Sequence, residues 1–237
     1  MTSSPRLRWR LVPALARFWA DDRGLSAFSV FLVVLAFVLP PLVPAGTGRS
    51  AVGDFVYFAL LLSGVHALGE RRLVRLVLMP VAVVTMAADL ASWFVPVPRP
   101  WVLAMGLLSL LLFFAVVLVQ TLRRGPITPH RIQGAVAAYL LLGVLWAYAY
   151  ALVEALRPGA FSGPISGADG PRALLYFSFV TLTTTGYGDV LPVHPAARSL
   201  ANLEAVTGTL FVAILVARLV SLAVSPGAGG RGHGGDR

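Results

Sequence analysis

The sequence predicts an all-α membrane protein with six transmembrane helices and a shorter re-entrant helix between the fifth and the sixth. Hydrophobic residues make up 57% of the 237 residues and charged residues 12%, whereas about 25% charged residues is usual in soluble domains. The mean hydropathy is +0.81. Six apolar runs are long enough, or nearly so, to cross a hydrocarbon core of about 30 Å as helices of roughly 20 residues. We therefore expect the chain to lie in a lipid bilayer.

The six apolar runs differ in the charges that interrupt them. The fourth contains no charge, whereas the second contains Asp54 and His66, the third Asp89, and the sixth Glu204 and Arg218. The first is about as long as a full span and no small-residue cleavage site follows it, so we interpret it as a helix and not as a cleaved signal peptide. In chain order, the runs are residues 25–43, 51–68, 76–95, 101–122, 132–153 and 199–224.

The arginines indicate the orientation of these helices. The net charge of +9 comes without any lysine, and most arginines lie in short segments between apolar runs, so we expect no nucleic-acid partner. Cytoplasmic loops are enriched in Lys and Arg, which predicts cytoplasmic termini and an external segment between the fifth and sixth runs. The arginines assigned to the cytoplasmic side are Arg6, Arg8, Arg10, Arg17, Arg23, Arg71, Arg72, Arg75, Arg123, Arg124 and Arg131.

The external segment contains the most informative motif. Asp169, Gly170 and Pro171 are typical of a helix start, and the apolar stretch 173–183 that follows is too short to span a bilayer. This stretch leads into Thr-Leu-Thr-Thr-Thr-Gly-Tyr-Gly-Asp at 181–189. Glycine permits backbone angles that other residues avoid, so successive carbonyls could all point the same way.

Residues 184–188 resemble the selectivity filter of the potassium channel family. In such filters, rings of backbone carbonyls replace the hydration shell of potassium, and one motif per chain implies a homotetramer. The filter residues implied by the resemblance are Thr184, Thr185, Gly186, Tyr187 and Gly188. The first four supply carbonyl ligands, and the Thr184 hydroxyl lies at the inner end. The family's commonest second residue is valine, so the side-chain contacts of Thr185 should differ while its carbonyl still faces the ion.

The resemblance also implies residues that support the filter. Asp189 is expected to hydrogen-bond behind the outer mouth, and Tyr176 and Phe177 to form part of an aromatic cuff. Some family members place a glutamate in the pore helix as the partner of that aspartate, but here the position is Val180. Glu204, at filter depth in the sixth run, is a candidate replacement because a carboxyl inside a span is costly. A structural carboxyl with no role in conduction is the equally weighted alternative.

The sixth run carries candidates for a hinge and a gate. Gly208 lies where many potassium channels have a hinge glycine, although close helix packing explains a small residue there about as well. Below it, Val212, Ala213 and Val216 recur at helical spacing. They could line an apolar constriction that gates by dewetting.

The rest of the chain resembles the six-helix voltage-gated-like cation channels, of bacterial type, without their sensor residues. Residues 25–124 match the sensor module in helix number, but a sensor needs several arginines along its fourth helix, since each charge contributes about 2.3 kcal/mol per 100 mV. The fourth run has none, so we predict no sensor-driven voltage gating. We expect three further parts: a cytoplasmic segment at 1–24, a pore domain at 131–224 and a flexible Gly-rich tail at 225–237, with no soluble ligand-binding domain.

These observations predict a potassium-selective channel subunit that conducts passively through a tetrameric pore. A weakly selective cation channel and a non-conducting structural or regulatory subunit are the alternatives. We expect no enzyme activity, because Asp89, Glu154 and Glu204 form no catalytic cluster, and no cofactor beyond the permeant potassium ions. Glu154 is interpreted as an interfacial charge. An Ala-, Val- and Leu-rich chain without lysine suggests a high-GC bacterium, and hence the inner membrane of a prokaryote.

Overall fold

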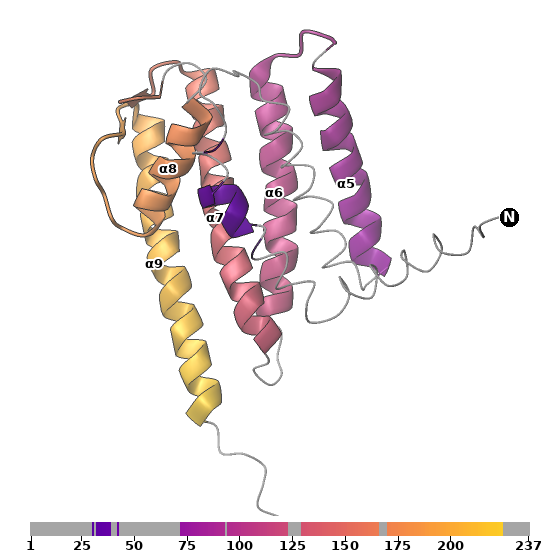
Figure 1. The fold of residues 1–237 in the computed structure, drawn as a ribbon, viewed down its shortest axis with the longest axis vertical. Coiled ribbons are helices and arrows are strands. Elements are labelled where there is room, and N and C mark those ends of the chain that lie inside the picture. Colours follow the sequence, from indigo (N-terminus) through magenta and orange to yellow (C-terminus); the bar gives the residue numbers. More distant parts are fainter. Residues whose placement is uncertain are drawn as a thin grey trace, which may run out of the picture.

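The computed structural model describes residues 30, 32–38, 42, 72–92, 94–122, 129–165 and 170–224. Four predictions concern residues outside these ranges: the cytoplasmic segment 1–24, most of the first run, the second run at 51–68, and the tail 225–237. Within the described residues, the protein is a bundle of long helices with one short helix packed against two of them (Figure 1).

The four long helices match the third to sixth apolar runs. They are α5 (Arg72–Ala91), α6 (Arg99–Leu122), α7 (Pro129–Leu156) and α9 (Pro195–Val224). Three of them have membrane length and apolar composition, namely Arg99–Val119, Gln133–Leu156 and Pro195–Arg218. In α5 the apolar stretch is the shorter Leu78–Ala91.

Prolines set several helix ends that apolar runs alone do not locate. α6, α7 and α9 each begin earlier than the matching run and have a proline in the first turn: Pro100, Pro129 and Pro195. Proline suits that position because its fixed φ is helical and the N–H it lacks would have no partner there. α5 ends at Ala91, earlier than predicted, and two prolines follow at Pro96 and Pro98.

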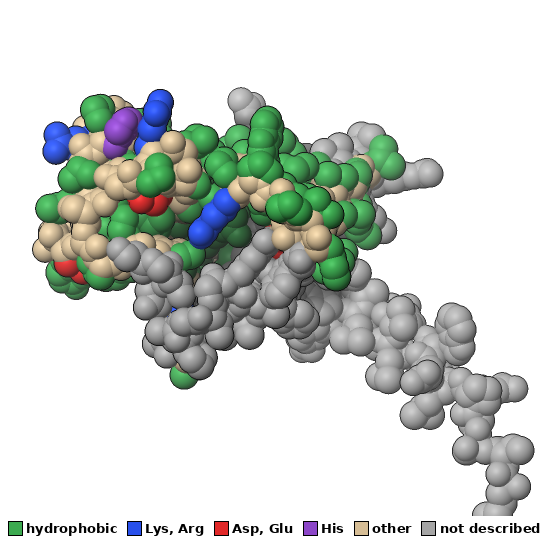
Figure 2. All heavy atoms as spheres, turned by 90° about the horizontal axis from the view of Figure 1, so that it is seen from above, with side chains coloured by type: hydrophobic (Ala, Val, Ile, Leu, Met, Phe, Trp, Pro, Cys, Tyr) green, Lys and Arg blue, Asp and Glu red, His purple; other side chains and the backbone are tan. Residues whose placement is uncertain are grey.

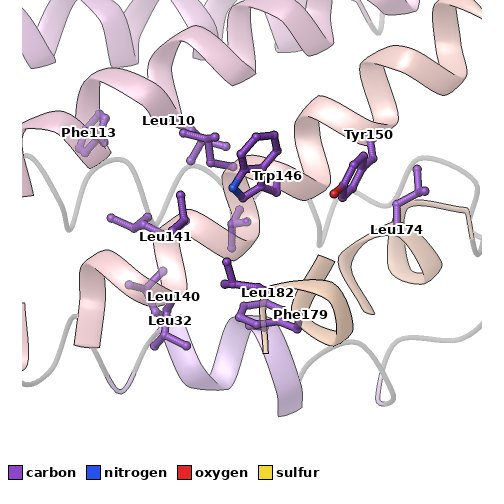
Figure 3. Packing of buried hydrophobic residues seen from close by; sticks show 14 of the residues in the cluster. Leu32, Leu110, Phe113, Leu140, Leu141, Trp146, Tyr150, Leu174, Phe179 and Leu182 are labelled. Atoms are coloured by element: carbon purple, nitrogen blue, oxygen red, sulfur yellow. The ribbon is translucent and has the colours of Figure 1, made fainter. Parts of the chain in front are cut away.

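α7 is the central helix of the bundle. Of its membrane-length stretch, 67% is buried, compared with 17% for that of α9. α6 packs along one side of α7, and the short helix α8 (Gly170–Leu182) lies between α7 and α9 (Figure 1). The buried cluster follows α7 from Leu140 past Trp146 to Tyr150 and includes Phe179 and Leu182 of α8 (Figure 3).

The described part of the first run also contacts this core. Residues 32 and 33 are helical and continue into a π-helical turn, η1 (Val34–Val38). Leu32 and Ala36 are buried. The rings of Phe37 and Phe179 lie with their centroids 4.8 Å apart, so this segment touches the short helix α8.

Candidate functional site

The short helix α8 and the loop after it form the candidate site. With 13 residues, α8 is only about 20 Å long at 1.5 Å per residue, too short to cross the hydrocarbon. The chain then returns along residues 183–190 to the antiparallel pairing of β1 (Phe161–Ser162) with β2 (Leu191–Pro192). Non-helical backbone at membrane depth must be buried in protein or line a water-filled path. In the membrane setting predicted from the sequence, this loop is confined to one of those two settings.

The loop leaves α8 through two backbone hydrogen bonds that close the helix end. Thr185 N–H donates to Val180 O at 2.8 Å, and Thr184 N–H donates to Thr181 O at 2.9 Å. This is the Schellman pattern, in which the residue after the helix adopts the left-handed conformation and is usually glycine. Here that residue is Thr184, with φ at 58°. A β-branched residue rarely adopts this conformation, and the penalty is about 1–2 kcal/mol.

Through the predicted filter, every second residue has a positive φ angle. Thr184, Gly186 and Gly188 have φ values of 58°, 61° and 79°, whereas Thr185 and Tyr187 are not among the residues with positive φ. In an ordinary strand, successive residues point to opposite faces. A backbone that inverts at every second residue can instead direct successive carbonyls to one side, as the sequence analysis expects for this motif.

Two hydroxyl groups brace the start of the loop. The Thr183 Oγ1 donates to Phe179 O at 2.7 Å, so its lone pairs remain free to accept. Thr185 Oγ1 lies 2.8 Å from Thr183 Oγ1 and can donate to it. The threonine that replaces the family's usual valine therefore continues a chain of hydrogen bonds that ends on the backbone of α8.

Of the residues predicted to support the filter, Tyr176 and Asp189 lie at the loop, whereas Phe177 packs against α7. Tyr176 stacks in parallel on Tyr187, with ring centroids 6.3 Å apart and planes 3° apart, and its hydroxyl is within electrostatic reach of Asp189. The Asp189 carboxylate also accepts from Val190 N–H at 3.1 Å. Phe177 faces α7 and lies edge-on to Tyr150 at a centroid distance of 5.0 Å. In this structure, Tyr176 is next to the predicted filter and Phe177 belongs to the buried aromatic cluster.

The segment between α7 and α8 packs on Asp189, directly after the predicted filter. The Glu154 carboxylate accepts from Gly159 N–H at 2.8 Å and from Phe161 N–H at 3.2 Å, so it caps the turn after α7. Gly163 has φ at 115°, and a β-carbon there would lie 2.3 Å from the Asp189 carbonyl oxygen. This close approach requires glycine at position 163.

Glu204 is buried where α7, α8 and α9 meet, with 0% of its surface exposed. Its Oε1 contacts Ser178 Oγ of α8 at 2.5 Å, and its Oε2 accepts from the Tyr150 hydroxyl of α7. Ser178 Oγ also donates to Gly143 O of α7 at 2.7 Å. Glu204 is selected from the sequence as a charge in an apolar run, whereas Tyr150 and Ser178 are not. A serine in an apolar run usually bonds to its own helix, and a tyrosine there is read as packing or an interfacial aromatic.

Gly208 lies one turn below Glu204 and touches the end of α8. A β-carbon at Gly208 would lie 2.5 Å from the Leu182 carbonyl oxygen, an oxygen that also accepts from the Tyr139 hydroxyl at 3.4 Å. α9 is continuously helical through this position. Of the two explanations for the glycine, this structure favours close packing. Val212 and Val216, below it, are exposed on the single chain.

The fold and site together define a helical protein with membrane-length helices and an ion channel segment. Residues 170–225, which include α8, the loop and α9, match the family model described as ion channel. The match covers about a quarter of the chain.

Curated relatives match a longer stretch. An inward rectifier potassium channel of Paramagnetospirillum magnetotacticum is 33% identical over 95 residues, which is 38% of this chain and 29% of that protein. Two pore potassium channel c of Oryza sativa subsp. japonica is 37% identical over 84 residues, or 35% of this chain and 17% of that protein. The chain thus covers less than a third of either relative. No solved structure matches it.

Replacing Gly208 with alanine tests the packing explanation. Helix propensity alone would stabilise α9 by about 1 kcal/mol, but the added methyl group meets the backbone of Leu182. Overpacking of this kind costs about 1–3 kcal/mol. We expect the melting temperature of the purified protein to fall.

The control for this variant is Thr209→Ala, at the next and exposed residue of α9, whose hydroxyl donates to Ala205 O of the same helix. It should leave the melting temperature nearly unchanged. A rise in the melting temperature of Gly208→Ala, as propensity alone predicts, would contradict close packing at Gly208.

Proposed function

We propose that the chain is a subunit of a potassium-selective ion channel and that four copies surround one pore. The observation that carries the proposal is the loop 184–188, in which residues with positive φ alternate with residues without it and which is bonded to the C-terminus of the short helix α8. Such a loop supplies carbonyl oxygens in place of water around an ion. The channels matched by the chain are named as potassium channels, which supports the choice of ion.

The exposure of the single chain supports an assembly around the loop. Residues 183–189 are all exposed, Tyr187 to 71%, and α9 is far less buried than α7. One loop contributes only part of a ring of ligands, so several chains must converge for a ring to form. Four loops facing one axis would also give this non-helical backbone the protein-lined setting it needs.

The electrostatics of α8 favour a cation below the filter. The C-terminus of a helix carries a partial negative charge, and α8 ends at Leu182, just before the loop. In the proposed tetramer, four such ends point toward the central cavity. Gly208, Val212 and Val216 then lie along the inner part of α9, where the two valines form an apolar gate.

The proposed setting is a lipid bilayer, in the inner membrane of a bacterium with both termini in the cytoplasm. Passive conduction requires no chemical step, so the proposed subunit is not an enzyme and uses no cofactor besides the permeant ion. Partners are three further copies of the chain and the surrounding lipid. A weakly selective cation channel is an outcome that the permeability measurement below distinguishes.

Two matched glycine substitutions test whether the loop is the filter. Gly186 and Gly159 both have positive φ, at 61° and 85°, and a β-carbon at either meets nothing within 4 Å. Alanine at either site therefore costs a similar backbone penalty of about 1–2 kcal/mol. In liposomes with a potassium gradient, we expect Gly186→Ala to abolish selective potassium flux and Gly159→Ala to keep it.

The control for this flux assay is an otherwise identical preparation with sodium as the only cation. Equal sodium flux through the unaltered protein would reduce the loop to a non-selective pore. Equal loss of flux in both variants would show that the effect comes from destabilisation and not from the loop.

Thr184 offers a separate test, because it combines a strained backbone with a hydroxyl at the inner end of the loop. Thr184→Gly removes the strain of about 1–2 kcal/mol, which exceeds the extra entropic cost of about 0.5–1 kcal/mol for ordering a glycine, and should raise the melting temperature slightly. It also removes the hydroxyl, so we expect a lower ratio of potassium to sodium permeability. Thr184→Ser keeps the hydroxyl and should keep the ratio. Unchanged selectivity in Thr184→Gly would exclude the hydroxyl from ion coordination.

A further inference from the structure

The hydroxyl of Ser178 contacts two oxygen atoms, Gly143 O and Glu204 Oε1, and it has too few protons to donate to both. Ser178 Oγ lies 2.7 Å from Gly143 O and 2.5 Å from Glu204 Oε1. A serine hydroxyl has one proton. A backbone carbonyl can only accept, and so can an ionised carboxylate, so the one proton of Ser178 cannot serve both contacts. The contact with Gly143 O can be satisfied only by that proton.

The contact between Ser178 and Glu204 then needs a proton from the other side. If Glu204 is ionised, either the 2.5 Å contact between Ser178 Oγ and Glu204 Oε1 or the 2.7 Å contact between Ser178 Oγ and Gly143 O has no hydrogen between its oxygen atoms. If Glu204 is a carboxylic acid, its Oε1–H donates to Ser178 Oγ and Ser178 donates to Gly143 O. Tyr150 donates to the remaining Oε2. All three contacts are satisfied only with the neutral acid.

The surroundings of the carboxyl group also oppose its ionisation. Its two side-chain partners are hydroxyl groups, from Ser178 and Tyr150. Phe161 and Phe177 surround the Tyr150 ring at centroid distances of 5.4 and 5.0 Å. An ionised carboxylate in such a place is strongly disfavoured unless a cation pairs with it, whereas a hydrogen-bonded neutral acid is tolerated.

We propose that Glu204 is a positioning residue, held as a neutral carboxylic acid, whose proton links α9 to Ser178 of α8 and so fixes the helix that ends at the filter. The proposal rests on the function proposed above for loop 184–188. Glu204 itself is buried, and its two side-chain hydrogen-bond partners belong to α7 and α8.

The geometry explains why one hydrogen bond can position the loop. Glu204 and Gly208 are one turn apart on α9, and they contact Ser178 and Leu182, one turn apart on α8. These two contacts hold the helices side by side. α7 completes the arrangement from the other side. The ring of Phe179 occupies the notch at Gly143, where a β-carbon would lie 2.7 Å from the ring.

A rotation or translation of α8 would break its contacts with Glu204 and Gly208 of α9. It would also shift Thr184, which the Schellman hydrogen bonds tie to the end of α8. Val180, on the same helix, offers no polar group that could take over the link. The position of the loop therefore depends on contacts made from α7 and α9, and Glu204 supplies the one that needs a proton.

The protonation state can be read directly by infrared spectroscopy of the full-length protein in lipid at neutral pH. We expect the C=O stretching band of a protonated carboxylic acid, and we expect Glu204→Gln to remove it. The control is Glu154→Gln, which changes a carboxylate that caps an outer turn and should leave the band in place. Absence of the band, or its persistence in Glu204→Gln, would overturn the proposal.

The positioning role is tested by the ratio of potassium to sodium permeability. Glutamine can still donate to Ser178 and accept from Tyr150, so Glu204→Gln should keep the ratio. Glu204→Leu should lower it by roughly fivefold to tenfold, the range that loss of one hydrogen bond produces. Equal ratios in the leucine variant and the unaltered protein would overturn the role, as would equal losses in the leucine and glutamine variants.

A smaller change covers the case in which Glu204→Leu does not fold. Ser178→Ala removes one oxygen atom and should lower the ratio to a similar extent, whereas Ser199→Ala, at an exposed serine of α9, should not. An unchanged ratio in Ser178→Ala would overturn the proposal. The infrared result does not depend on conduction, so a protein with the band but without selective flux would refute the proposed function alone.

Discussion

In the proposed membrane setting, the structure depends on one constraint, which is that a non-helical loop at membrane depth must keep its backbone polar groups satisfied without water from the bilayer. The loop after α8 meets this constraint at its beginning by bonding back to α8. The N–H groups of Thr184 and Thr185 bond to carbonyls in the last turn of α8, and the hydroxyl of Thr183 bonds to another. The position of the loop therefore depends on the position of α8, and α8 must in turn be fixed by its own contacts.

α7 is the element that holds α8 from the inside of the bundle. It offers a small residue, Gly143, where the Phe179 ring packs, and a carbonyl at the same residue that accepts from Ser178. Tyr139 reaches the carbonyl of Leu182. Since α7 packs against α6 and is the most buried of the membrane-length helices, these contacts connect the loop to the core of the described bundle. Seen from above, much of the described surface is apolar, and arginine side chains appear at separate places on it, some of them beside a histidine at one edge (Figure 2).

Two features near the loop each cost free energy of folding, and both are present in this structure. Thr184 adopts a conformation that glycine would adopt without steric strain, and Glu204 places a carboxyl among apolar helices. Strain of this kind persists only where the surrounding structure enforces it, as the bonds to Val180 and Thr181 do here. The hydroxyl of Thr184 and the proton of Glu204 are the properties that glycine and an apolar residue would lack.

The sequence by itself determined the helical character of the chain, the positions of the third to sixth apolar helices, and the motif at 184–188, because hydropathy and glycine spacing are local properties. It also selected Glu204, since a charge in an apolar run is visible without a structure. Only the tertiary structure decided that Tyr150 and Ser178 share that carboxyl group, that Phe177 faces α7 while Tyr176 faces Tyr187, and that Gly208 meets Leu182. These pairings join residues far apart along the chain, and the face that each helix turns to its neighbour is set by packing.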